Sequence, residues 1–145
     1  FTWDFSDGTI YIGQSKDNLA NGKGTVIFGT GEWQDDLYTG EFLNDFRHGM
    51  GTYIHSDGDV YIGEYLNHEK NGNGIYIYGP GEWEGDIYKG EFKNGLKHGF
   101  GTYFYKRGDI YRGEFQNNDF NGRGTYTFID GQILDGFFSN GEFIE

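Results

Sequence analysis

Apolar and polar positions alternate with a period of two along most of the chain. In the segment YIGEYL (61–66), Tyr, Gly and Tyr fall on one side of an extended backbone and Ile, Glu and Leu on the other. This alternation is typical of β-strands, and no stretch has the 3.6-residue period of an amphipathic helix. Dipeptides such as Asp57-Gly58 predict turns between these segments, and Asn71-Gly72 predicts a tight turn or the end of a longer loop. The pattern therefore predicts consecutive antiparallel hairpins.

The alternating segments form an internal repeat that begins with the motif aromatic-x-Gly-acid or a near copy of it. Successive copies start 27, 23, 27, 23 and 23 residues apart, and the longer units carry four extra residues in a connection that contains Gly-Glu-Trp. We expect a single domain over residues 1–145, with a partial first unit at 1–10 and a degenerate C-terminal unit at 133–145. The five full units start near Tyr11, Tyr38, Tyr61, Tyr88 and Tyr111.

Two strands in each unit give about 12 strands, and a spacing of ~4.8 Å gives a ribbon ~55–60 Å long. We expect an all-β fold, an elongated single-layer twisted antiparallel sheet without helices. The aromatic residues of all units share one face, predicted to be concave, where glycines let a ring lie on the backbone. The other face is predicted to be convex and hydrated. It carries Thr and Ile together with the row Gln14, Glu41, Glu64, Glu91, Glu114 and Asp135.

Composition and charge exclude several classes of chemistry and of binding partner. The 27 Gly, 12 Tyr and 14 Phe with only 35% hydrophobic residues fit a thin protein that buries mainly aromatic rings. The absence of Cys excludes disulfides and thiolate chemistry. Eleven Lys and Arg against 23 Asp and Glu give a net charge of −12, which repels nucleic acid and disfavours anionic membrane lipids.

The repeat resembles the MORN (membrane occupation and recognition nexus) repeat, Y-x-G-E-[FY]-x-N-G-x-x-H-G-x-G-T-Y. Residues 88–103 (YKGEFKNGLKHGFGTY) match this motif at almost every position, and residues 38–53 nearly so. The resemblance implies a twisted single-layer sheet of hairpins used for assembly or target binding. The chain departs from the motif in its four-residue expansions, in Gln14-Ser15, and in the units at Tyr61 and Tyr111, which lack the His-Gly pair.

No catalytic constellation is present, so we expect no enzymatic activity, no cofactor and no metal. The repeated carboxylates are expected to be structural, because an even row gives each member nearly the same environment. His48 and His98 occupy equivalent positions and are expected to form hydrogen bonds at turns, with a metal held between two copies of the protein as the alternative. A calcium ion beside Asp35-Asp36 and Glu32 is a second alternative.

The aromatic face is the candidate partner site, because an exposed groove of Tyr and Phe is typical of binding surfaces. The alternative is that the rings only bury one another. Trp33 and Trp83, from the Gly-Glu-Trp expansions, are candidate edge anchors, unless each ring only covers its own turn. The predicted partner-binding residues are Tyr38, Phe42, Tyr53, Tyr61, Tyr65, Tyr76, Tyr88, Phe92, Tyr103 and Tyr111.

These features predict a non-catalytic scaffold that binds a peptide or helix of a partner protein, cytoplasmic and in part cytoskeletal or ciliary. The acidic net charge predicts a basic or amphipathic partner. Self-association through open sheet edges is an alternative. Because the chain does not begin with Met, it is expected to be part of a longer protein. The resemblance then also allows a targeting or regulatory region of a SET-domain methyltransferase or a lipid kinase, and phospholipid binding is a further alternative.

Overall fold

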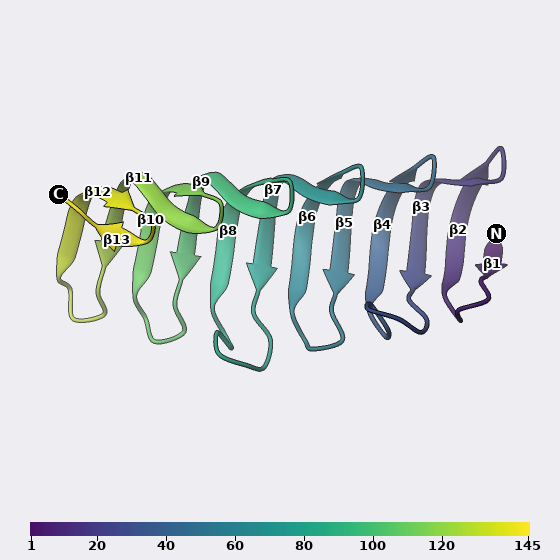
Figure 1. Ribbon diagram of the computed structural model, residues 1–145, viewed down its shortest axis with the longest axis horizontal. Helices are drawn as coiled ribbons and strands as arrows, with labels where there is room; N and C mark the ends of the chain where they lie inside the picture. Colours follow the sequence, from purple (N-terminus) through teal and green to yellow (C-terminus); the bar gives the residue numbers. More distant parts are fainter.

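The computed structural model describes residues 1–145 and shows a single antiparallel sheet of 13 strands, with no helix (Figure 1). Every strand pairs with its neighbours in sequence, so the chain is one continuous meander. This confirms the predicted single-layer sheet of hairpins. The strands are β1 (Thr2–Asp4), β2 (Ile10–Lys16), β3 (Leu19–Ile27), β4 (Leu37–Leu43), β5 (Phe46–Ile54), β6 (Val60–Leu66), β7 (Glu69–Ile77), β8 (Ile87–Lys93), β9 (Leu96–Phe104), β10 (Ile110–Gln116), β11 (Asp119–Thr127), β12 (Ile133–Ser139) and β13 (Glu142–Phe143).

Two-residue turns join the strands of each hairpin along one edge of the sheet, which we call the hairpin edge. In the β6–β7 turn, Asn67 and His68 both have positive φ, 48° and 72°, as a type I′ turn requires. The prediction of a turn at Asn71-Gly72 is wrong, because both residues lie inside β7. Gly72 has φ 99° there because the register between β6 and β7 shifts at Glu64, forming a β-bulge.

The glutamates of the repeat motif satisfy the backbone at these bulges. The carboxylate of Glu41 accepts a hydrogen bond from the Met50 N–H at 2.6 Å, and Glu64 accepts one from the Asn73 N–H. Gln14, Glu91 and Glu114 make the same contact in their own units. These five members of the predicted row are thus structural, since each accepts an N–H that the interrupted ladder leaves free. Asp135, the last member, instead accepts hydrogen bonds from the side chains of Arg123 and Thr125.

The first tyrosine of each unit lies flat on a pair of glycines. The Tyr61 ring covers Gly63 and Gly74, and its hydroxyl donates to the Glu64 carbonyl at 2.8 Å. A methyl group on Gly74 would lie 2.5 Å from Cε2 of Tyr61, so no larger residue fits. The equivalent tyrosines Tyr38, Tyr61, Tyr88 and Tyr111 have no exposed surface.

Edge-to-face ring contacts join these tyrosines into one core. Tyr61 meets Tyr65 of its own unit at 5.2 Å and Phe92 of the next unit at 5.1 Å, measured between ring centroids. Tyr38 makes the same two contacts with Phe42 and Tyr65. Each unit therefore completes the core of its neighbour, as in other repeat arrays.

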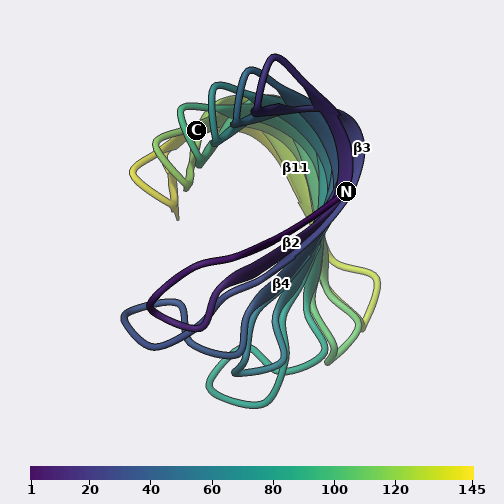
Figure 2. The ribbon, with the colours of Figure 1, turned by 90° about the vertical axis from the view of Figure 1, so that its right-hand side faces the viewer.

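The strands bend strongly, so the sheet seen along its long axis has a C-shaped section (Figure 2). At the hairpin edge each turn donates a backbone hydrogen bond to the preceding hairpin, as from His68 N to Arg47 O at 3.0 Å and from Gly95 N to Lys70 O at 2.9 Å. These bonds connect the hairpins where they curl over the aromatic face. That face is therefore concave, as predicted.

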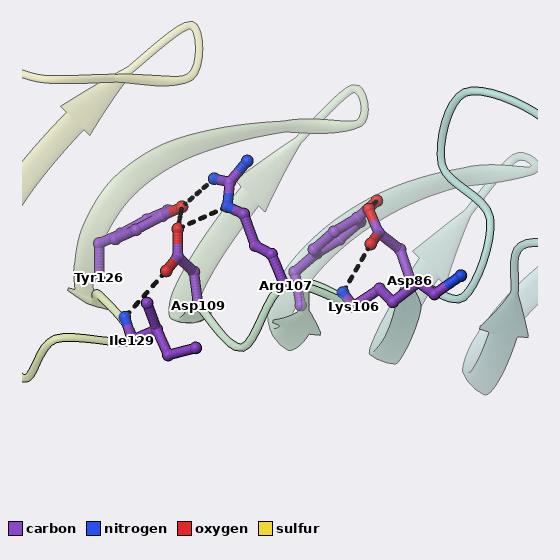
Figure 3. A network of polar contacts seen from close by, with 7 residues as sticks. Asp86, Lys106, Arg107, Asp109, Tyr126 and Ile129 are labelled. Atoms are coloured by element: carbon purple, nitrogen blue, oxygen red, sulfur yellow. Dashed lines mark hydrogen bonds and ion pairs between the residues drawn. The ribbon is translucent and has the colours of Figure 1, made fainter.

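A repeated aspartate–tyrosine contact fixes the opposite edge, which we call the connection edge (Figure 3). Asp86 accepts a hydrogen bond from the Tyr103 hydroxyl at 2.8 Å and one from the Lys106 N–H at 2.8 Å. Hydrogen bonds from the Ile129 N–H, Tyr126 and Arg107 hold the pKa of Asp109 below its usual range. The same contact joins Tyr53 to Asp36 and Tyr76 to Asp59.

The convex face carries an apolar row beside the acidic row. Next to the connection edge, apolar side chains face one another across every strand pair from β2 to β10. The glutamates lie nearer the hairpin edge, where the bulges hold them. The apolar row consists of Ile10, Ile27, Leu37, Ile54, Val60, Ile77, Ile87, Phe104 and Ile110.

We expect Gly74→Ala to destabilise the fold by about 3 kcal/mol or more, because the new methyl group collides with the buried Tyr61 ring. Gly81→Ala is the control, since a methyl group there has no neighbour within 4 Å and only the positive φ of 144° is unfavourable. Its expected cost is about 1 kcal/mol. Urea unfolding measures both. Equal stability of the two variants would contradict the ring–glycine contact.

Tyr103→Phe is expected to cost about 1–3 kcal/mol, because it leaves a buried oxygen of Asp86 without its donor. Tyr105→Phe is the matched control. Its hydroxyl donates to no aspartate, and Phe28 and Phe128 occupy the same position in other units. The control should unfold at the wild-type urea concentration. A wild-type midpoint for Tyr103→Phe would show that the contact contributes no stability.

Candidate partner-binding groove

The hollow of the C-shaped section contains a groove of about 580 Å³, which we call the concave groove. Asp45, His68 and Gly95 line it from the hairpin edge, and Phe28, Trp33 and His55 from the connection edge. Its floor includes Tyr65 together with Arg47 and Lys70. The groove thus runs across several units and has walls from both edges of the sheet.

The predicted partner-binding aromatics differ in the surface that they offer. Tyr38, Tyr61, Tyr88 and Tyr111 are wholly buried, so for these rings the alternative that they only bury one another holds. Phe42, Tyr53, Tyr65, Phe92 and Tyr103 are also buried, although three of them line the concave groove, while Tyr76 is half-buried. More surface belongs to rings just after the long strands, which were not among the predicted site residues: Phe28, Tyr78, Tyr105 and Phe128.

The two tryptophans combine both expected roles. Trp33 meets Phe28 edge-on at 6.3 Å, and Trp83 meets Tyr78 at 6.0 Å, so each ring covers an aromatic of its own connection. Yet their exposed fractions are 56% and 55%, and Trp33 lines the groove. Each ring is therefore supported on one side and free on the other.

The sequence analysis missed a row of cations on the concave face. Arg47, Lys70 and Lys97 occupy one position of the repeat, five residues after Phe42, Tyr65 and Phe92. This spacing is visible in the sequence and could have identified the row. The other two units carry Ala20 and Phe120 at the same position, so only the central three units are cationic.

Each of these cations lies among three aromatic rings. The Arg47 guanidinium is 5.2–5.7 Å from the centroids of Tyr38, Tyr53 and Tyr65. The Lys70 ammonium is 4.7–5.6 Å from those of Tyr61, Tyr76 and Phe92. The Lys97 ammonium is 5.3–5.7 Å from those of Tyr78, Tyr88 and Tyr103. Such cation–π contacts favour the charged form of the side chain.

None of the three cations has a carboxylate partner, since the ion pairs of the structure lie elsewhere. The buried Nε of Arg47 has no hydrogen-bond partner, and the Lys97 ammonium donates only to the Tyr78 hydroxyl, at 2.6 Å. Burial, followed by the charge of Lys70, lowers the pKa of Lys97 to about 8. Burial also lowers the pKa of Lys70, although Asp59 and Glu69 oppose the shift.

The histidines that were expected at turns, and the residues of the alternative metal sites, have other surroundings in the structure. His48 and His98 lie inside β5 and β9 and not at turns, and the buried Nδ1 of His48 has no partner. Asp36 is committed to Tyr53 and to the Ser56 N–H, and no group of three His, Asp or Glu side chains is arranged to hold a metal ion. The structure has no helix that could cross a membrane.

The lowered pKa of Lys97 predicts a pH effect on stability. Between pH 8 and its ordinary pKa of 10.5, the unfolded chain holds a proton that the folded chain has released, so stability rises with pH. Relative to Lys97→Met, the free energy of unfolding of the wild type should increase by about 1 kcal/mol from pH 7 to pH 9. Urea unfolding of both proteins at both pH values measures this. If the difference in unfolding free energy between the wild type and Lys97→Met were the same at pH 7 and pH 9, the lowered pKa of Lys97 would be contradicted.

The family comparison agrees with this repeat structure. The MORN repeat model matches the chain five times, at residues 11–33, 38–60, 61–83, 88–110 and 111–133. Such repeats form modules of the protein-interaction or membrane-binding type. No curated protein matches the chain. The matched residues include the core tyrosines, the bulge glutamates and the three cations of the concave face, and the chain belongs to the MORN repeat family.

Proposed function

We propose that the protein is a non-catalytic interaction module that holds a segment of a partner protein in the concave groove. The observation that carries the proposal is the groove itself, open along the inner face of the sheet and lined by aromatic side chains from successive units. A hollow that crosses several repeats suits an elongated ligand such as a helix or an extended peptide.

Some rings are buried in the core and others are partly exposed, so a partner can bind the exposed rings without disrupting the core. The wholly buried tyrosines hold the sheet together, whereas Phe28, Tyr78 and the exposed tryptophans lie on top of that core. Large amphipathic rings on a rigid support are the usual anchors of protein interfaces. Trp33 and Trp83 are more than half exposed, so each has a large ring surface to bury on binding.

The sign of the partner's charge is a separate matter. The net charge of −12 predicts a basic partner, and that prediction stays untested. It describes the whole surface, however. Arg47 and Lys70 line the groove together with Asp45 and Glu69, and Lys97 continues the row of cations in the next unit of the concave face.

The test is selection of 20-residue peptides from a displayed random library on the immobilised protein. Binders should lose at least tenfold in affinity for Trp33→Ala/Trp83→Ala, because the variant removes an exposed ring that lines the groove and the equivalent exposed ring of the second long connection. The control is Met50→Ala/Phe100→Ala, which removes two equally exposed side chains from the convex face and should leave the affinity unchanged. Failure to select binders, or binders weakened only by the control variant, would overturn the proposal.

A further inference from the structure

The core does not explain the row of cations on the concave face, Arg47, Lys70 and Lys97. Burying a charge without a counter-ion costs free energy, and natural cores place apolar residues where no charge is needed. Phe120 shows that an apolar ring fits this position, because it stacks on Tyr111 at 3.7 Å. The central three units nevertheless carry Arg47, Lys70 and Lys97.

The rest of the molecule offers these cations no ion pair, and the Arg47 guanidinium donates a hydrogen bond only to the His68 carbonyl, at 3.1 Å. The acidic side chains of the motif are held at the bulges on the convex face, and the aspartates of the connection edge are bonded to tyrosines. The nearest influences on Lys70 and Lys97 come from Asp59, Glu69 and Asp119, none of them within ion-pair distance. A protein with net charge −12 thus presents a row of three cations without ion-pair partners on its concave face, with Asp45 and Glu69 in the wall of the groove beside them.

We propose that the groove selects an acidic partner segment, whose carboxylates pair with Arg47, Lys70 and Lys97 while its apolar side chains meet the groove aromatics. This inference rests on the proposed function and adds the chemistry of the ligand. The negative outer surface strengthens the selection, because a ligand that is attracted only to the outside of the protein would be basic.

The spacing of the row defines the ligand further. The three cations lie on β5, β7 and β9, so neighbours are two strands, or about 9.6 Å, apart. Residues i and i+7 of an α-helix are separated by about 10.5 Å on nearly the same face. Residues i and i+3 of an extended polyproline II segment are separated by about 9.3 Å. The partner should therefore carry Asp or Glu with one of these two periods.

The same peptide selection tests the inference through the composition of the binders. Acidic residues at i, i+7 or i, i+3 spacing should be enriched over basic ones. The binders should lose at least tenfold in affinity for Lys70→Met/Lys97→Met, and their wild-type affinity should fall as salt is raised. Methionine keeps the apolar stem among the rings, and the thermal unfolding of the variant shows whether its fold is retained. The control Lys89→Met/Lys93→Met removes two exposed charges that lie outside the groove and should change the affinity little.

The outcomes separate the two proposals. Binders that depend on Trp33 and Trp83 but are basic or uncharged would overturn the acidic selection and leave the groove as the binding site. Failure to select binders, or binders indifferent to both the tryptophan and the lysine variants, would overturn both proposals. Vesicles of phosphatidylcholine with phosphatidylserine serve as the competing probe. If they bind the wild type but not Lys70→Met/Lys97→Met, and no acidic peptide does so, the ligand is a lipid surface and the inference is wrong.

Discussion

The close approach of a tyrosine ring to a pair of glycines is the contact on which this fold depends. A single layer of strands has no second sheet to pack against, so each apolar side chain must find its burial on the sheet itself. A ring lying flat on Gly63 and Gly74 achieves this, because two missing side chains leave space the thickness of a ring above the backbone. Its hydroxyl then donates to the Glu64 carbonyl at the bulge, which fixes the ring in position.

That contact organises the other elements of the unit. The bulge that supplies the carbonyl also frees the N–H that the glutamate side chain accepts, so ring, bulge and acid form one local structure. The ring edge meets the aromatic of the next unit, which makes the core continuous from hairpin to hairpin. Because every ring stands on the same face, the sheet bends around them, and the concave groove is a consequence of the way the core is built.

The cations Arg47, Lys70 and Lys97 on the concave face are opposite in sign to the net charge of the protein, although Asp45 and Glu69 also line the groove. Most carboxylates of the motif accept hydrogen bonds from the backbone or from tyrosine, and the sheet separates the convex glutamates from the groove. The cations, by contrast, extend along the inner face, where the ring faces lie closest to them and the nearest carboxylates stay beyond ion-pair distance. If a partner segment binds as proposed, net charge is a poor guide to its chemistry, since the segment would meet three particular side chains at close range.

The sequence alone determined the all-β class, the repeat boundaries and the assignment of the aromatic and glycine positions to one face, because these follow from a period of two and from in-register repetition. It misplaced the turn at Asn71-Gly72, since Asn-Gly favours positive φ wherever it occurs and only the strand pairing showed that β7 needs it at a bulge. It also placed His48 and His98 at turns, whereas they lie inside β5 and β9. Only the tertiary structure decided which rings stay exposed and that Arg47, Lys70 and Lys97 lie in aromatic surroundings without counter-ions. Those properties arise from contacts between neighbouring units across a curved sheet. The curvature cannot be predicted from the alternation of residues within one unit.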